Sequence, residues 1–211
     1  MEEDIRILDS ATFHESISVY DKFELEPLLL ELASESLQKA KATHEEARKR
    51  LEKEKQHLEL QVAKYCAATI LFAHALVEAY LNWILQHRML THHDLLRKGL
   101  GEIVNRIRSP IPERWISIVE VTGFLATGKW TPVSNELGEG AGKLAELRNF
   151  IAHYKAKLIL TEKLPKRDDG TVITEAEQKL TLENAERAVE TAKGLIVELH
   201  RLENSSSPKW L

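Results

Sequence analysis

The sequence predicts an all-α protein, and three observations favour this fold class. Aromatic residues make up only 6% of the 211 residues, and Gly and Pro are sparse, which argues against a sandwich or barrel of many short strands. Apolar residues recur at helical spacing over long stretches. With 43% apolar and 29% charged residues, the chain can bury one sizeable core. We therefore expect one main domain.

The N-terminal part is predicted to hold a weakly structured segment and then a charged helix. Residues 1–26 show no sustained helical period, whereas Pro27 suits the first turn of a helix. Apolar residues then recur every seven positions at Leu30, Leu37, Leu51, Leu58 and Tyr65, beside small residues at Ala33, Ala40 and Ala47. This pattern predicts a coiled-coil-like helix over 27–61, compatible with an arm packed on its own domain or with a dimer coil. It continues into the apolar stretch 62–87 as one very long helix or as two with a kink.

Residues 62–203 are predicted to form the main helical bundle. Further helices are expected at about 92–107, 113–126, 142–160 and 181–202, the last with Thr181 as N-cap. The glycines before the third of these, Gly138, Gly140 and Gly142, suggest a flexible lead into it. Asp169-Gly170 is a turn signal, compatible with a small hairpin over 163–174 or with a plain loop. Residues 204–211 are expected to form a flexible tail.

The most apolar window, residues 62–85, is interpreted as a buried core helix. It is long enough to cross a bilayer, but Lys64, His74 and Glu78 would be costly there, so no membrane association is expected. The single Cys66 lies in this window, which suits a buried thiol in a reducing compartment. The first ten residues lack the basic start and apolar stretch of a secretory signal, so we expect a cytoplasmic protein.

The helix expected over 142–160 carries the residues with the clearest chemical potential. Arg148 is followed directly by the polar Asn149 and, five positions on, by His153. Asn149 and His153 lie one turn apart on the same side of a helix, and the long planar fork of Arg148 can swing toward them. Arg88 and His93 have the same spacing, but an apolar residue follows Arg88 and the pair straddles an expected helix end.

These three residue types can cleave RNA without a metal. The reaction needs a base to deprotonate the 2′-hydroxyl, a cation for the charged phosphorane and an acid for the leaving oxygen. His153 can act as base or acid because imidazole titrates near neutral pH, Arg148 can clamp the phosphate, and Asn149 can position either group. The net charge of −4 argues against a broadly basic nucleic-acid binder. Local RNA-binding residues are nevertheless predicted around the motif at Lys143, Tyr154, Lys155 and Lys157.

A second polar feature lies on the predicted core helix. His74, Glu78 and Asn82 step by four residues and form one polar line on an otherwise apolar helix. We expect this line to support the motif. His87, His92 and His93 span an expected helix end without a clear cluster of further ligands, so neither a metal nor another cofactor is predicted.

The element around Arg148 and His153 resembles the signature of the HEPN superfamily, and the resemblance covers about residues 62–202. It implies a helical bundle, a polar partner on an early helix, for which we select Glu78, and a homodimer in which two motifs share one groove. The activity it implies is metal-independent endoribonuclease cleavage that leaves 2′,3′-cyclic phosphate ends. The setting it implies is toxin or antiviral defence, with an antitoxin or other regulatory protein as a further partner. Several toxins of the family have Tyr where this chain has Lys155, which argues against the nucleotidyltransferase-paired branch.

Two other hypotheses remain. The chain is compatible with a non-catalytic HEPN-like dimer that binds RNA or a protein partner through the same groove, and with a purely structural helical adaptor. Only the endoribonuclease hypothesis predicts that RNA is cleaved. Of the other two, the non-catalytic dimer predicts salt-sensitive RNA binding and the structural adaptor does not.

Overall fold

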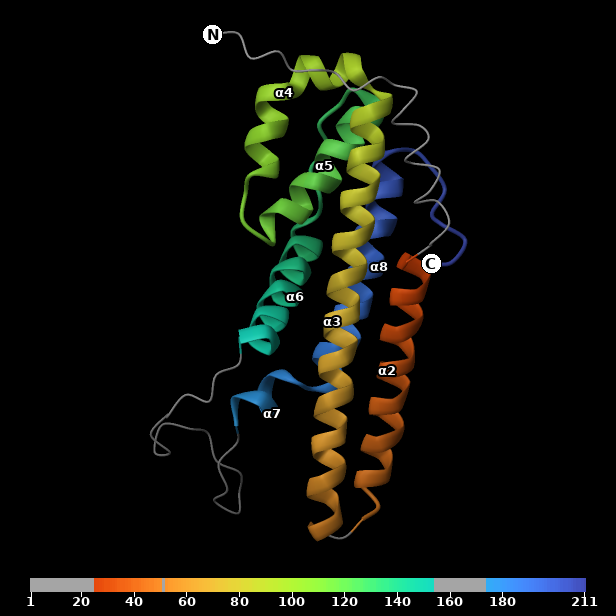
Figure 1. The fold of residues 1–211 in the computed structure, drawn as a ribbon, viewed down its shortest axis with the longest axis vertical. Coiled ribbons are helices and arrows are strands. Elements are labelled where there is room, and N and C mark those ends of the chain that lie inside the picture. Colours follow the sequence, from red (N-terminus) through yellow and green to blue (C-terminus); the bar gives the residue numbers. More distant parts are fainter. Residues whose placement is uncertain (1–24, 51, 154–173) are drawn as a thin grey trace.

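The computed structural model describes residues 25–50, 52–153 and 174–211, and the predicted all-α class is confirmed. Within these ranges there are helices but no strands (Figure 1). The helices are α2 (Leu25–Ala47), α3 (Glu52–Thr91), α4 (His93–Ile107), α5 (Glu113–Thr127), α6 (Asn135–His153), α7 (Glu175–Lys179) and α8 (Leu182–Leu202).

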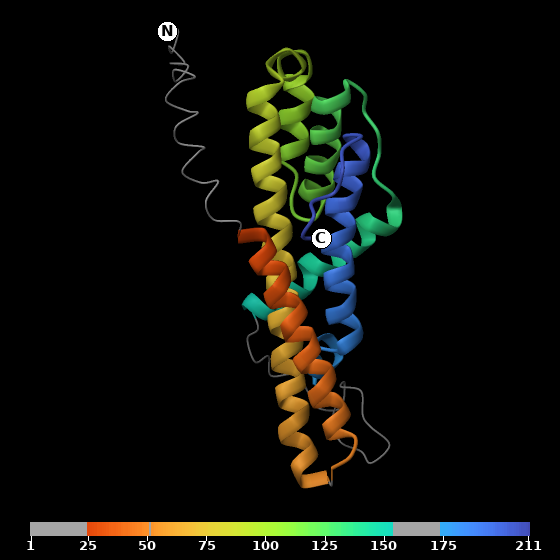
Figure 2. The same cartoon turned by 90° about the vertical axis from the view of Figure 1, so that its right-hand side faces the viewer.

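Helices α2 and α3 form an antiparallel pair (Figures 1 and 2). The single helix expected over 27–61 is wrong, because the chain leaves α2 at Ala47 and α3 begins at Glu52. Ala33, Ala40 and Ala47 are buried, so the small stripe lets α2 lie close to its neighbours in the same chain. The charged residues Arg48–Arg50 are exposed at the turn, where water solvates them.

Helix α3 is the central element of the core. It contacts α2, α5, α6 and α8. The largest fully buried side chains include Ile70, Leu76 and Leu81 of α3, Trp115, Ile118 and Leu125 of α5, and Leu195, Ile196 and Leu199 of α8. By length and composition the 55–91 stretch of α3 could span a membrane, a test that core helices of globular proteins also pass. Cys66 is fully buried, as predicted, and burial raises the pKa of its thiol to about 12.

Helix α6 begins at Asn135, earlier than the sequence predicts. The expected flexible lead is wrong, since Gly138, Gly140 and Gly142 are helical. Close packing explains one of these glycines, because a Cβ added at Gly140 would lie 2.7 Å from Oγ1 of Thr191 on α8. The expected continuation over 154–160 lies outside the described residues, as do the segment 1–24 and residues 163–173 of the expected hairpin.

The last helix and the residues after it close one side of the bundle. Thr181 caps α8 as predicted, its side chain accepting a hydrogen bond from the backbone N–H of Asn184 at 3.2 Å. The expected flexible tail is corrected, because the Trp210 ring packs edge-on against Tyr80 with centroids 5.7 Å apart. The burial of apolar ring surface holds this segment on α3.

Candidate functional site

The three motif residues come from the last turn and a half of α6. Arg148 is half-buried, whereas Asn149 and His153 are exposed. Successive residues of a helix are rotated by about 100°, so Asn149 and His153 share one side and Arg148 lies on another. Nη1 of Arg148 donates a hydrogen bond to Oδ1 of Asn149 at 3.2 Å. The structure thus joins Arg148 to Asn149, and within the described residues no hydrogen bond joins either one to His153.

The charge of Arg148 acts on the polar line of α3. His74 on that line is 5% exposed, and its ring meets the Trp115 ring edge-on with centroids 4.8 Å apart. Burial, and then the nearby positive charge of Arg148, lower the pKa of His74 to about 4. His74 is therefore neutral at neutral pH, and the guanidinium of Arg148 is close enough to affect it.

Glu78 connects this line to a residue that sequence analysis missed. Its Oε2 lies 3.7 Å from Nδ1 of His74, and its Oε1 lies 3.6 Å from Nη2 of Arg114 in the first turn of α5. Both distances exceed those of good hydrogen bonds, so the carboxylate is shared loosely. The Nε atom of Arg114 and the Nε1 atom of Trp115 are buried without a hydrogen-bond partner.

We call this set the arginine cluster; its members are His74, Glu78, Arg114, Trp115 and Arg148. It draws on three helices, α3, α5 and α6, which contact one another. With His74 neutral, two guanidiniums and one carboxylate leave a local positive charge. An anion that brings hydrogen-bond acceptors would be favoured there.

The other predicted site residues are not all brought to this cluster. Asn82, one step beyond Glu78 on the polar line, is exposed. Lys143 is exposed and pairs with Glu146 at 3.1 Å, and it is rotated by about 140° around α6 from Arg148. Tyr154, Lys155 and Lys157 lie outside the described residues, so the structure places only Lys143 of the predicted RNA-binding set.

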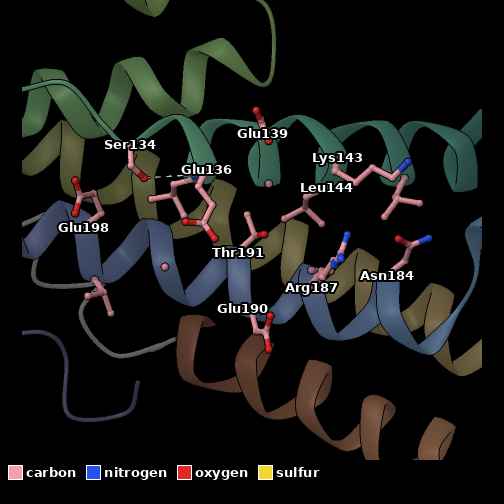
Figure 3. A pocket seen from close by; sticks show the side chains of 16 residues that line it. Ser134, Glu136, Glu139, Lys143, Leu144, Asn184, Arg187, Glu190, Thr191 and Glu198 are labelled. Atoms are coloured by element: carbon pink, nitrogen blue, oxygen red, sulfur yellow. Dashed lines mark hydrogen bonds between the residues drawn. The ribbon is translucent and has the colours of Figure 1, made fainter.

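A groove of about 650 Å³ lies between α6 and α8 (Figure 3). Its charged lining has both signs and comprises Glu136, Glu139, Lys143, Arg187, Glu190 and Glu198. None of the three motif residues lines it. Four carboxylates against two cations do not favour a polyanion in this groove.

The described part of the chain contains no group of three or more His, Cys, Asp or Glu side chains arranged to hold a metal ion.

Comparison with protein-family models, with curated proteins and with solved structures finds no match to this chain.

Proposed function

We propose that this protein is a metal-independent endoribonuclease of HEPN type. The observation that carries the proposal is the environment of Arg148. Its side chain is half-buried, its charge contributes to the lowered pKa of His74, it donates to Asn149, and no carboxylate of the described residues forms an ion pair with it. A guanidinium held in this way keeps donors for a phosphate group.

The proposed reaction begins when His153 takes the proton of a 2′-hydroxyl. The 2′-oxygen forms a bond to phosphorus, and Arg148 stabilises the charge that develops on the phosphorane oxygens. The bond to the 5′-oxygen then breaks, and the leaving oxygen receives a proton. The products are a 2′,3′-cyclic phosphate and a 5′-hydroxyl end.

The leaving oxygen needs a proton donor other than the His153 that has just acted as base. His74 does not suit this role, because it is buried and its lowered pKa keeps it unprotonated at neutral pH. We infer that a second copy of the chain supplies the acid, with two copies of the α6 motif facing one RNA strand in a homodimer. In a toxin or antiviral setting, an antitoxin or other regulatory protein would restrain this activity.

The test is incubation of the purified protein with a mixed RNA substrate in excess chelator, followed by analysis of product ends. Arg148→Ala and His153→Ala should abolish cleavage, whereas the unmodified protein should leave 2′,3′-cyclic phosphate ends. Arg187→Ala is the matched control, because Arg187 is an exposed arginine of α8 that pairs with Glu183 at 2.8 Å. Undiminished cleavage by folded His153→Ala would contradict the mechanism.

The alternative function is a non-catalytic dimer that binds RNA or a protein partner. It is favoured by one observation, the lack of a hydrogen bond from His153 to Arg148 or Asn149 among the described residues. This alternative predicts salt-sensitive RNA binding without turnover, weakened by substitution of Lys155 or Lys157.

A further inference from the structure

Arg114 is an arginine whose hydrogen-bonding capacity is only partly used. Its contact with Glu78, at 3.6 Å, is an ion pair without a hydrogen bond, and its Nε is buried without a partner. Partly exposed ion pairs of this kind contribute little to stability. A buried donor without an acceptor costs free energy, which Arg114 would recover by moving toward a bound anion; its side chain is 36% exposed and so within reach of one.

The carboxylate of Glu78 lies where it can balance the positive charge of this arginine. One of its carboxylate oxygens is directed toward His74 and the other toward Arg114, and the side chain is 33% exposed. Because neither contact is tight, an anion with several oxygens can compete with Glu78 for Arg114. Competition of this kind leaves Arg114 available to a ligand that enters from solvent.

Arg114 and Arg148 belong to two helices that pack on α3 and on each other. A Cβ added at Gly142 of α6 would lie 3.6 Å from Pro112, two residues before Arg114. Both guanidiniums are therefore carried by helices that pack together, and both act on the polar line of α3: Arg114 lies 3.6 Å from Glu78, and the charge of Arg148 contributes to the lowered pKa of His74. Guanidiniums on fixed supports suit planar, multidentate acceptors such as phosphate groups.

We propose that Arg114 is a second phosphate-binding residue of the site, which takes an RNA phosphate neighbouring the one held by Arg148 and leaves Glu78 when the strand enters. The inference rests on the proposed function for the identity of the strand. It assigns Arg114 to substrate binding and Glu78 to the control of that binding.

The experiment measures binding of a 2′-O-methyl RNA oligomer, which lacks the attacking hydroxyl, at a series of salt concentrations. Losing one phosphate contact should weaken binding by Arg114→Gln roughly fivefold near 0.1 M salt and reduce the salt slope by about 0.7. Arg187→Gln, the matched control, should bind like the unmodified protein. Glu78→Gln should bind more tightly, because it removes the competing carboxylate; general destabilisation does not produce such a gain.

A parallel cleavage assay with unmodified RNA separates the two proposals. Arg114→Gln should raise KM and largely retain kcat. If the unmodified protein cleaves RNA while Arg114→Gln keeps its affinity and salt slope, the role of Arg114 is overturned and the nuclease stands. If the unmodified protein neither binds nor cleaves RNA, the proposed function is overturned and this inference with it. If Arg114→Gln fails to fold, unchanged or weaker binding by Glu78→Gln overturns the inference.

Discussion

Two histidines, His74 and His200, are buried in the bundle. His74 lies beside Trp115, and His200 hydrogen-bonds to the hydroxyl groups of Tyr80 and Ser205. Burial is the largest cause that lowers the pKa of each imidazole. The unfolded chain therefore binds more protons than the folded one below the ordinary histidine pKa, and both residues make the fold less stable as pH falls.

We expect His74 to contribute to acid destabilisation between pH 6.5 and about 4, the ordinary pKa and the pKa in the fold. The folded protein favours the neutral form of His74. Stability is therefore unaffected by this residue above pH 6.5 and decreases as pH falls below it. At about pH 5 the loss amounts to about 2 kcal/mol. Urea unfolding at several pH values should show a flatter dependence for His74→Gln, and an identical dependence would contradict the assignment.

At the scale of the helices, glycines mark where two backbones approach closely. Gly123 of α5 is buried, and a Cβ added there would lie 2.9 Å from Cβ of Leu202 on α8. Gly138 of α6 has open space, with nothing within 4 Å of an added Cβ. Glycine therefore has a packing role at Gly123 and none at Gly138.

Alanine at these two glycines should have opposite effects on the free energy of unfolding. Gly123→Ala forces α5 and α8 apart and should lower it by about 1–3 kcal/mol. Gly138→Ala meets no neighbour and should raise it by about 0.5–1 kcal/mol, because alanine has the higher helix propensity. Urea denaturation at neutral pH measures both, and stabilisation by Gly123→Ala would mean that the helices can separate without cost.

For the whole molecule, the residues after α8 contact α3 and so connect the end of the chain to the central helix. Glu203 accepts hydrogen bonds from Nε and Nη2 of Arg88 at 2.7 and 2.9 Å, and its side chain is 1% exposed. Trp210 covers Tyr80 on the same helix, α3. The C-terminal residues thus hold α8 against α3.

Loss of the buried carboxylate should be costly. Glu203→Ala leaves Arg88 with no carboxylate in a partly buried position and should lower the free energy of unfolding by about 3 kcal/mol. Glu183→Ala is the control, since its pair with Arg187 is exposed and should contribute less than about 1 kcal/mol. Thermal unfolding of the two variants should differ by several degrees, and equal midpoints would show that Arg88 is resolvated without penalty.

The sequence by itself determined the elements whose causes are local. Apolar periodicity marked the helices, and Thr181 marked the start of α8 because a cap needs only the next turn. The same local geometry placed Arg148, Asn149 and His153 on one helix. Arg88, which shares the motif's spacing with His93, is instead held by Glu203.

Only the tertiary structure decided which surfaces meet. A heptad stripe is the same whether its partner helix belongs to the same chain or another, so periodicity did not reveal that α2 turns back onto α3. From the sequence alone, Gly140 indicates a loop. In the fold it lies in α6, where the lack of a side chain lets α8 pack closely against it. Arg114 is 36 residues from Glu78, and no local pattern links them. Their contact depends on how α5 packs against α3, because packing brings together residues that the chain itself keeps apart.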